Sequence, residues 1–329
     1  MIELNDDRLV IRFPEVHEDA RLTIDFQRTL RIPDDDREYP LPAGLGRFPL
    51  RHVDDFPRSV PASWIEHGGV MLPMYQAEAL WMWFGGDYPF AVKIATGKIN
   101  AVTGEEWRDG LNRGPQDYLT APDQPWLDGY CVEKGVIRQF VAMPLGKGYT
   151  AEEQITGRAD VGGLQIVAYP MKREVYQRRE SRHRLGAAVL SKAMAGESAG
   201  MGLAPGGRMR QQIFRDRGEL SDWDQRHRAR CFVHIANALQ WRDITGEAPP
   251  TKPVTAEAYR RQGIPWFDYY AADLEALEGS GILRRLRSVV QLGKDKREAA
   301  VPENDPIAID RVVQLRRGLE RSEVREGVF

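Results

Sequence analysis

The stretch Glu78-Ala-Leu-Trp-Met-Trp-Phe84 decides the fold. In a β-strand successive side chains point to opposite faces, so Trp81 and Trp83 would share one face, and the leucine, methionine and phenylalanine would share the other. Gly85-Gly86-Asp87 ends the run at a strand-like length, and the aromatic content favours a strand over a helix. Because both faces are apolar, we expect the strand to be covered on both sides and both tryptophans to belong to the core.

Two segments that follow, 90–102 and 127–143, have the pattern of β-hairpins. In each, an apolar run reaches a short turn and then returns as a second apolar run. Gly97 lies in the first turn and Gly135 in the second, and glycine-containing turns between apolar runs are typical of hairpins. A short strand is also expected at 70–74.

Towards the N-terminus, the segment 22–32 alternates apolar and polar residues and predicts a half-buried strand. We expect it to pair with the apolar run at 9–13. The run Pro33-Asp-Asp-Asp36 is interpreted as a solvated turn, because three adjacent aspartates lack the alternating ligand spacing of a calcium loop. Residues 39–61 are rich in proline and glycine and are expected to be irregular.

Beyond residue 143 the sequence predicts more helix than strand. Thr150-Ala-Glu-Glu153 has the form of a capping box that opens a short helix, and 163–169 is expected to be the last strand. The segment 196–207 has five glycines in twelve residues, which predicts a mobile loop. The strongest helix is expected from Ser221 to Thr245, with Gly246 as its stop. Further helices are expected at 185–195, 255–261, 268–277, 282–292 and 307–319.

These elements predict an α+β fold, with an antiparallel β-sandwich or barrel followed by a helical C-terminal portion. The β domain is expected over 1–171, and a basic, glycine-rich mobile connector over 172–210. A helical portion packed on the β domain is expected at 211–292. Residues 293–329 are expected to form a linker with a C-terminal helix and tail.

Composition and charge narrow the class of protein. The 329 residues are 42% hydrophobic and 29% charged, which is typical of a soluble globular protein. The net charge of −2 provides no global field for nucleic acid or an anionic membrane, so neither partner is expected. The N-terminus has no signal-peptide pattern, and no segment approaches the roughly 18 apolar residues of a membrane helix. Two cysteines, Cys131 and Cys231, are too few for a disulfide framework, so we expect a cytoplasmic protein.

The sharpest cluster of possible metal ligands lies on the helix expected after Ser221. Asp224, His227, Cys231 and His234 would share one face of that helix. The two histidines would be about 10 Å apart along the axis, at about 1.5 Å per residue, which is too far for one ion. We therefore expect no metal and no cofactor, and we interpret this face as one packed on the β domain.

Charged residues within the apolar strands are the candidate site residues, because burying a charge is costly unless it is paired. They could pair with one another, for example Lys93 or Arg138 with a glutamate, or lie on an exposed face. Alternatively, they could line a polar pocket beside the two tryptophans. The sequence identifies no catalytic residue, and the candidate ligand-binding residues are Glu78, Trp81, Trp83, Lys93, Glu133 and Arg138.

Two classes of function are compatible with the sequence. The first is a non-enzymatic binding or assembly protein of the cytoplasm, with a protein partner or a second copy docked through the helical C-terminal part. The second is an enzyme or small-ligand-binding protein with a polar pocket beside Trp81 and Trp83. Convergence of the candidate side chains in one concave site would favour the second class, and their dispersal would favour the first.

Overall fold

The structure, a computed structural model, describes residues 1–180, 201–248, 252–269, 271, 274–299 and 301–315. Its strands are β1 Ile2–Leu4, β2 Leu9–Arg12, β3 Arg21–Thr29, β4 Glu38–Tyr39, β5 Leu41–Pro42, β6 Gly44–Arg47, β7 Arg51–His52, β8 Val70–Pro73, β9 Ala79–Gly85, β10 Phe90–Thr96, β11 Ile99–Asn100, β12 Leu119–Ala121, β13 Trp126–Leu127, β14 Gly129–Glu133, β15 Val136–Pro144, β16 Leu164–Pro170, β17 Met201–Arg210, β18 Ala229–Ala236, β19 Trp266–Tyr269 and β20 Val312–Leu315. Its α-helices are α1 Ala62–His67, α2 Ala151–Thr156, α3 Arg173–Glu180, α4 Ala238–Thr245, α5 Ala256–Arg261, α6 Gly281–Arg284 and α7 Val289–Lys296.

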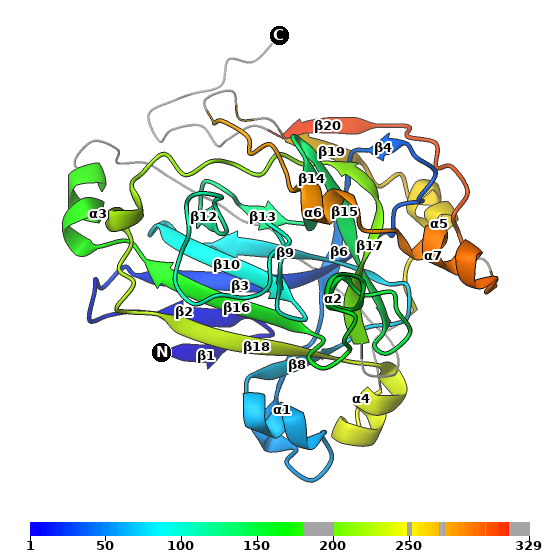
Figure 1. Ribbon diagram of the computed structural model, residues 1–329, viewed down its shortest axis with the longest axis horizontal. Coiled ribbons are helices and arrows are strands. Elements are labelled where there is room, and N and C mark those ends of the chain that lie inside the picture. Colours follow the sequence, from blue (N-terminus) through cyan, green and yellow to red (C-terminus); the bar gives the residue numbers. More distant parts are fainter. Residues whose placement is uncertain (181–200, 249–251, 270, 272–273, 300, 316–329) are drawn as a thin grey trace.

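Two series of strands make up most of one large, mainly antiparallel sheet. One series runs β1-β2-β3-β9-β15-β17, and the other runs β12-β10-β16-β18-β8-β7. They join where Met201 of β17 pairs with Ile235 of β18. The helices are short, and α1 and α4 lie together at one end of the molecule (Figure 1). The fold is therefore α+β and dominated by its sheet.

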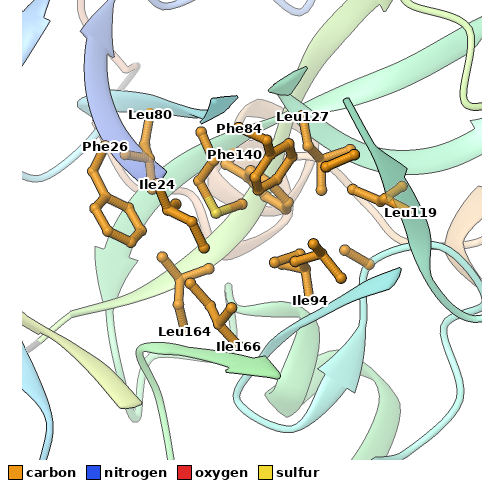
Figure 2. Close-up of a cluster of buried hydrophobic side chains, with 14 of the residues drawn as sticks. Ile24, Phe26, Leu80, Phe84, Ile94, Leu119, Leu127, Phe140, Leu164 and Ile166 are labelled. Carbon is orange, nitrogen blue, oxygen red and sulfur yellow. The ribbon is translucent and has the colours of Figure 1, made fainter. Parts of the chain in front are cut away.

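The main core lies between these two series. Figure 2 shows Ile24, Phe26 and Leu80 of the first series facing Leu164 and Ile166 of the second. All five side chains are buried. The alternation that predicts β3 and the apolar run that predicts β9 are thus confirmed as strands, and these strands pair with each other in antiparallel register.

Several local predictions are confirmed. The two hairpins are β10–β11 and β14–β15, the segment 9–13 pairs through β2 with β3, and β8 and β16 are strands. Thr150 caps α2 with a reciprocal capping box formed with Glu153. Gly246 adopts the left-handed conformation after α4, and Thr255 caps α5. These are signals carried by a few adjacent residues, which is why the sequence alone reveals them.

The long helix predicted from Ser221 to Thr245 is wrong. Ala229–Ala236 in the middle of this segment is β18, which pairs with β16 and β8, and the α-helix is confined to Ala238–Thr245. Along β18 every second residue is apolar, and these side chains, Ala229, Cys231, Val233 and Ile235, are buried. A period of two is the strand pattern, and pairing on both sides stabilises it over the helix. The prediction that 163–169 is the last strand is wrong for the same reason.

The glycine-rich segment 196–207 is also not the loop that we expect, as far as the structure describes it. Residues 201–207 belong to β17 and are buried, whereas 185–195 and 196–200 lie outside the described residues. A Cβ on Gly206 would lie 2.5 Å from a methyl carbon of Val141, and one on Gly207 would lie 2.3 Å from the Pro33 carbonyl oxygen. These glycines allow neighbouring chain segments to pack closely. From composition alone, the same glycines predict a mobile loop.

The helical C-terminal portion is not clearly shown. The described part of 268–277 contains the end of β19 and no helix, and 282–292 is divided between α6 and α7. The described part of 307–319 contains β20, which pairs in parallel with β19. The region 39–61 likewise contains the short strands β4 to β7 rather than only irregular chain. None of the helices within the described ranges is long and apolar enough to cross a membrane.

Buried glutamine side chains join irregular segments to the sheet. The Gln139 side chain accepts a hydrogen bond from the Ile32 amide at 2.8 Å and donates one to the Leu30 carbonyl at 2.9 Å. Gln116 and Gln124 pair in the same way with the backbone of residues 212–216. A carboxamide offers the same donor and acceptor as a peptide group, so it can replace a missing strand neighbour.

Candidate functional site

The charged candidate residues do not converge on one pocket. Glu78 pairs with Arg28, Lys93 with Asp117, Arg138 with Asp34, and Glu133 with Arg208. All four candidate charges are paired, but none of them has a partner that the sequence analysis names. Glu133 and Arg138 lie in the same hairpin, and Trp81 and Trp83 lie on β9. The candidate residues that lie near one another are therefore those that are already close in sequence.

The Arg28–Glu78 pair is buried between the strands. The Arg28 Nε atom donates to Glu78 Oε1 at 2.7 Å, and the two side chains are 2% and 1% exposed. The Tyr75 amide donates to the other carboxylate oxygen at 2.9 Å. Burial raises the pKa of Glu78 to about 7, although the guanidinium opposes that shift. The pair therefore fixes the start of β9 against β3.

Lys93 anchors the loop between β11 and β12, residues 101–118, to the outer face of the second strand series. Its neighbours Val92 and Ile94 are core residues, so Lys93 points to the opposite face of β10. Its Nζ atom lies 2.5 Å from Asp117 Oδ2 and donates to the carbonyls of Arg108 and Gly110 at 2.8 Å each. An ammonium group has three N–H donors, so this lysine is fully hydrogen-bonded.

A cavity of about 240 Å³ lies where this loop crosses β10. We call it the Lys93 cavity. Its floor is formed by four buried polar residues, Lys93, Asn100, Thr103 and Asp117. The other lining residues form its walls and mouth, and they are Glu105, Glu106, Arg108, Asp109, Gly110, Leu111 and Asn112. Asn100 holds the floor in place, because its carboxamide accepts from the Val102 and Thr103 amides and donates to the Asp117 carbonyl. The cavity is thus a polar, preformed space with a rigid floor.

A smaller cavity of about 90 Å³ lies beside it, and Glu106 and Trp107 line this second space together with Lys98, Glu152 and Arg158. The Glu152 carboxylate accepts hydrogen bonds from the amides of residues 160–162. The ring of Trp107 lies 5.3 Å from Lys93 Nζ. Trp107 therefore lines the smaller cavity and forms a cation–π contact with Lys93.

Trp81 and Trp83 line neither of these cavities. Both indoles are half-buried on the face of β9 that points away from the core. The Trp83 ring lies against Gly85, where an added Cβ would come within 2.0 Å of it, and the Trp81 ring lies against Gly44 at 2.9 Å. We expect both to be fully covered, and the structure instead leaves each partly exposed.

The sequence interpretation missed all four charged partners, which are Arg28, Asp34, Asp117 and Arg208. Arg28 occupies an apolar position of the alternation in β3, between Phe26 and Leu30, and that misplaced charge is a readable signal of a buried pair. Asp34 is not in a solvated turn: its side chain is 4% exposed and accepts from Arg138 at 3.1 Å. Asp117 carries no local signal, because only the path of the loop brings it to Lys93.

The four possible metal ligands in residues 224–234 do not share a helix face, because this segment is not a helix and its second half is β18. His227 pairs with Asp224 at 2.9 Å, whereas the His234 ring contacts the Gly68 carbonyl at 3.1 Å. Burial lowers the pKa of His234 to about 4. Within the described residues, no group of three or more histidine, cysteine, aspartate or glutamate side chains is placed to hold a metal ion. Burial also raises the pKa of Cys131 and of Cys231 to about 12, which makes both thiols poor nucleophiles.

Asp128 is a carboxyl group whose burial favours its neutral form. Gln211 donates to its Oδ2 atom at 2.7 Å and accepts from its backbone amide at 3.0 Å. Burial raises the pKa of Asp128 from 3.8 to about 7, and the hydrogen bond from Gln211 only partly opposes this shift. Asp128 therefore ionises at a lower pH in the unfolded chain than in the folded protein. The folded state loses stability as pH rises from about 4 to about 7.

We therefore expect Asp128→Asn to stabilise the protein at pH 8 and to change its stability little at pH 4. The gain at pH 8 is about 1.4 kcal/mol for each unit by which the folded pKa exceeds the unfolded value, with roughly 4 kcal/mol as the upper limit. Urea unfolding at both pH values measures it, with Asp87→Asn as an exposed control. An equal effect of Asp128→Asn at the two pH values would contradict this assignment.

The chain matches no protein-family model, and comparisons with the curated proteins and with the solved structures also find no match.

Proposed function

We propose that this protein is a binding protein rather than an enzyme, and that it binds a small polar ligand in the Lys93 cavity. The observation that carries the proposal is that this polar cavity is preformed while its floor charges are already neutralised by each other. A general base or a nucleophile needs a free lone pair. The Lys93 ammonium group has none and uses all three of its N–H groups, whereas the Asp117 carboxylate is held in place by Lys93 and the Asn112 amide.

The cavity size limits the ligand. At about 240 Å³ it is smaller than the roughly 300–1,000 Å³ of sites for drug-sized molecules, so it suits a ligand of a few heavy atoms. The dispersal of Glu78, Glu133 and Arg138 into separate ion pairs argues against a shared pocket beside Trp81 and Trp83. Residence in the reducing cytoplasm is part of the proposal, supported by two free, buried cysteines. Docking of a protein partner or a second copy through the C-terminal part stays a prediction.

Protein-observed NMR with a panel of small polar fragments tests this proposal. We expect the amide shifts to cluster at residues 103–112, and we expect them to disappear in Asn112→Trp, which fills the mouth of the cavity. Asp87→Trp, an exposed site remote in sequence from the loop, is the matched control. Shifts that cluster at Trp81 and Trp83 would instead support the pocket expected from the sequence, and no shifts at residues 103–112 would overturn the proposal.

A further inference from the structure

The mouth of the Lys93 cavity differs from its floor in how firmly its charges are held. On the floor, Lys93 and Asp117 are 2% and 9% exposed and lie 2.5 Å apart. At the mouth, Glu105 and Arg108 lie 4.0 Å apart, and Arg108 is 75% exposed. An exposed pair at that distance contributes little, typically about 0–1 kcal/mol, so either member can exchange its partner for a ligand group at small cost.

The remaining charges of the lining are held by partners outside the cavity. Asp109 contacts Arg230 at 3.0 Å and Arg228 at 3.7 Å, and Glu106 contacts Arg158 at 3.2 Å. None of these three arginines lines the cavity. The contact between Glu105 and Arg108 is the longest of these, at 4.0 Å, and both of its members line the cavity.

We propose that the cavity takes a small zwitterion such as a free amino acid, with the ligand ammonium on Glu105 and its carboxylate on Arg108. The inference rests on the proposed binding function and names its ligand class. A zwitterion replaces both halves of the loose pair at once, so no charge is left without a partner. Leu111 and Thr103 supply one apolar and one hydroxyl-bearing wall for a small side chain.

Ligands with a single charge fit less well. The lining carries two cations, Lys93 and Arg108, and four carboxylates, those of Glu105, Glu106, Asp109 and Asp117, a formal sum of −2 that opposes a simple anion. A simple cation would compete with Arg108 for Glu105 and would leave the guanidinium unpaired at the mouth. Each single-charge ligand thus forms one of the two contacts and disrupts the other.

Titrations of the full chain with L-alanine, ethylamine and propionate, followed by NMR, test the inference. We expect alanine to shift the amides of residues 103–112 saturably, and the two single-charge analogues to bind at least tenfold more weakly. Glu105→Gln and Arg108→Gln should each weaken alanine binding at least tenfold, and Arg108→Gln keeps the carbonyl that Lys93 uses. Lys134→Gln, which removes an exposed ion pair with Glu278 and involves no lining residue of the cavity, should leave alanine binding unchanged.

Equal binding of alanine and either analogue would overturn the inference, as would alanine binding that survives both substitutions, or no alanine binding at all. The fragment panel separates this failure from failure of the proposed function. Neutral fragments that still shift residues 103–112 would leave the cavity as a binding site and exclude only the zwitterion.

Discussion

Arg28→Met is expected to lower the free energy of unfolding by about 3–5 kcal/mol, because it leaves a buried charge without its partner. The side chain of Glu78 is 1% exposed and would keep only the Tyr75 amide as a described hydrogen-bond donor. Urea unfolding at pH 8, where Glu78 is mostly ionised in the parent protein, measures the loss. The loss is expected to be smaller at pH 5, since the carboxyl group then becomes neutral at lower cost.

The double variant Arg28→Met with Glu78→Leu tests whether the loss of stability comes from the unpaired buried charge. Replacing both members of a buried ion pair by apolar residues is often neutral, so the double variant should recover most of the lost stability. A loss below about 1 kcal/mol for Arg28→Met would be ordinary for a surface substitution and would contradict burial of this pair.

Lys93→Met is expected to lower the free energy of unfolding by a similar amount, about 3–5 kcal/mol, and to loosen the loop of residues 101–118. The substitution removes the cation that Asp117 and the carbonyls of Arg108 and Gly110 share. Because these acceptors span the loop, its amides should also exchange with deuterium faster than those of β16, the neighbour of β10. Chemical denaturation and hydrogen exchange measure the two effects.

Lys98→Met is the matched control for this variant. Lys98 is an exposed lysine in the turn of the same hairpin, so its loss should change stability by less than about 0.5 kcal/mol. If Lys93→Met and Lys98→Met have equal effects, Lys93 is not the anchor of the loop.

The parts of the fold that the sequence predicts are those encoded over a few residues. Alternation in β3, the glycine turn between β10 and β11 and the capping box at Thr150 are of this kind. The segment that becomes β18 has the same alternation, but Ser221 before it and Gly246 after it have the form of helix caps. β18 lies between β16 and β8, and these pairings join residues far apart in sequence, so local signals cannot show them.

The candidate site is predicted only in part. A lysine between Ala91 and Ala95 correctly marks Lys93 as unusual, because an unpaired ammonium on a buried strand face is costly. Its partner Asp117 lies beyond the loop and has no pattern that links it to β10. The residues at the mouth, Glu105 and Arg108, look like ordinary polar loop residues in the sequence. Their place beside a cavity follows from the path of the loop alone.

The nitrogen–proton NMR signal of the Lys93 ammonium group tests most directly whether the charged strand residues act in separate pairs. We expect this signal to be resolved, since the group is buried and hydrogen-bonded, and to shift strongly in Asp117→Asn. The same signal should stay in place in Glu78→Gln, because Glu78 belongs to the Arg28 pair. A shift in Glu78→Gln as large as that in Asp117→Asn would show that the two charges share one site and would contradict this account.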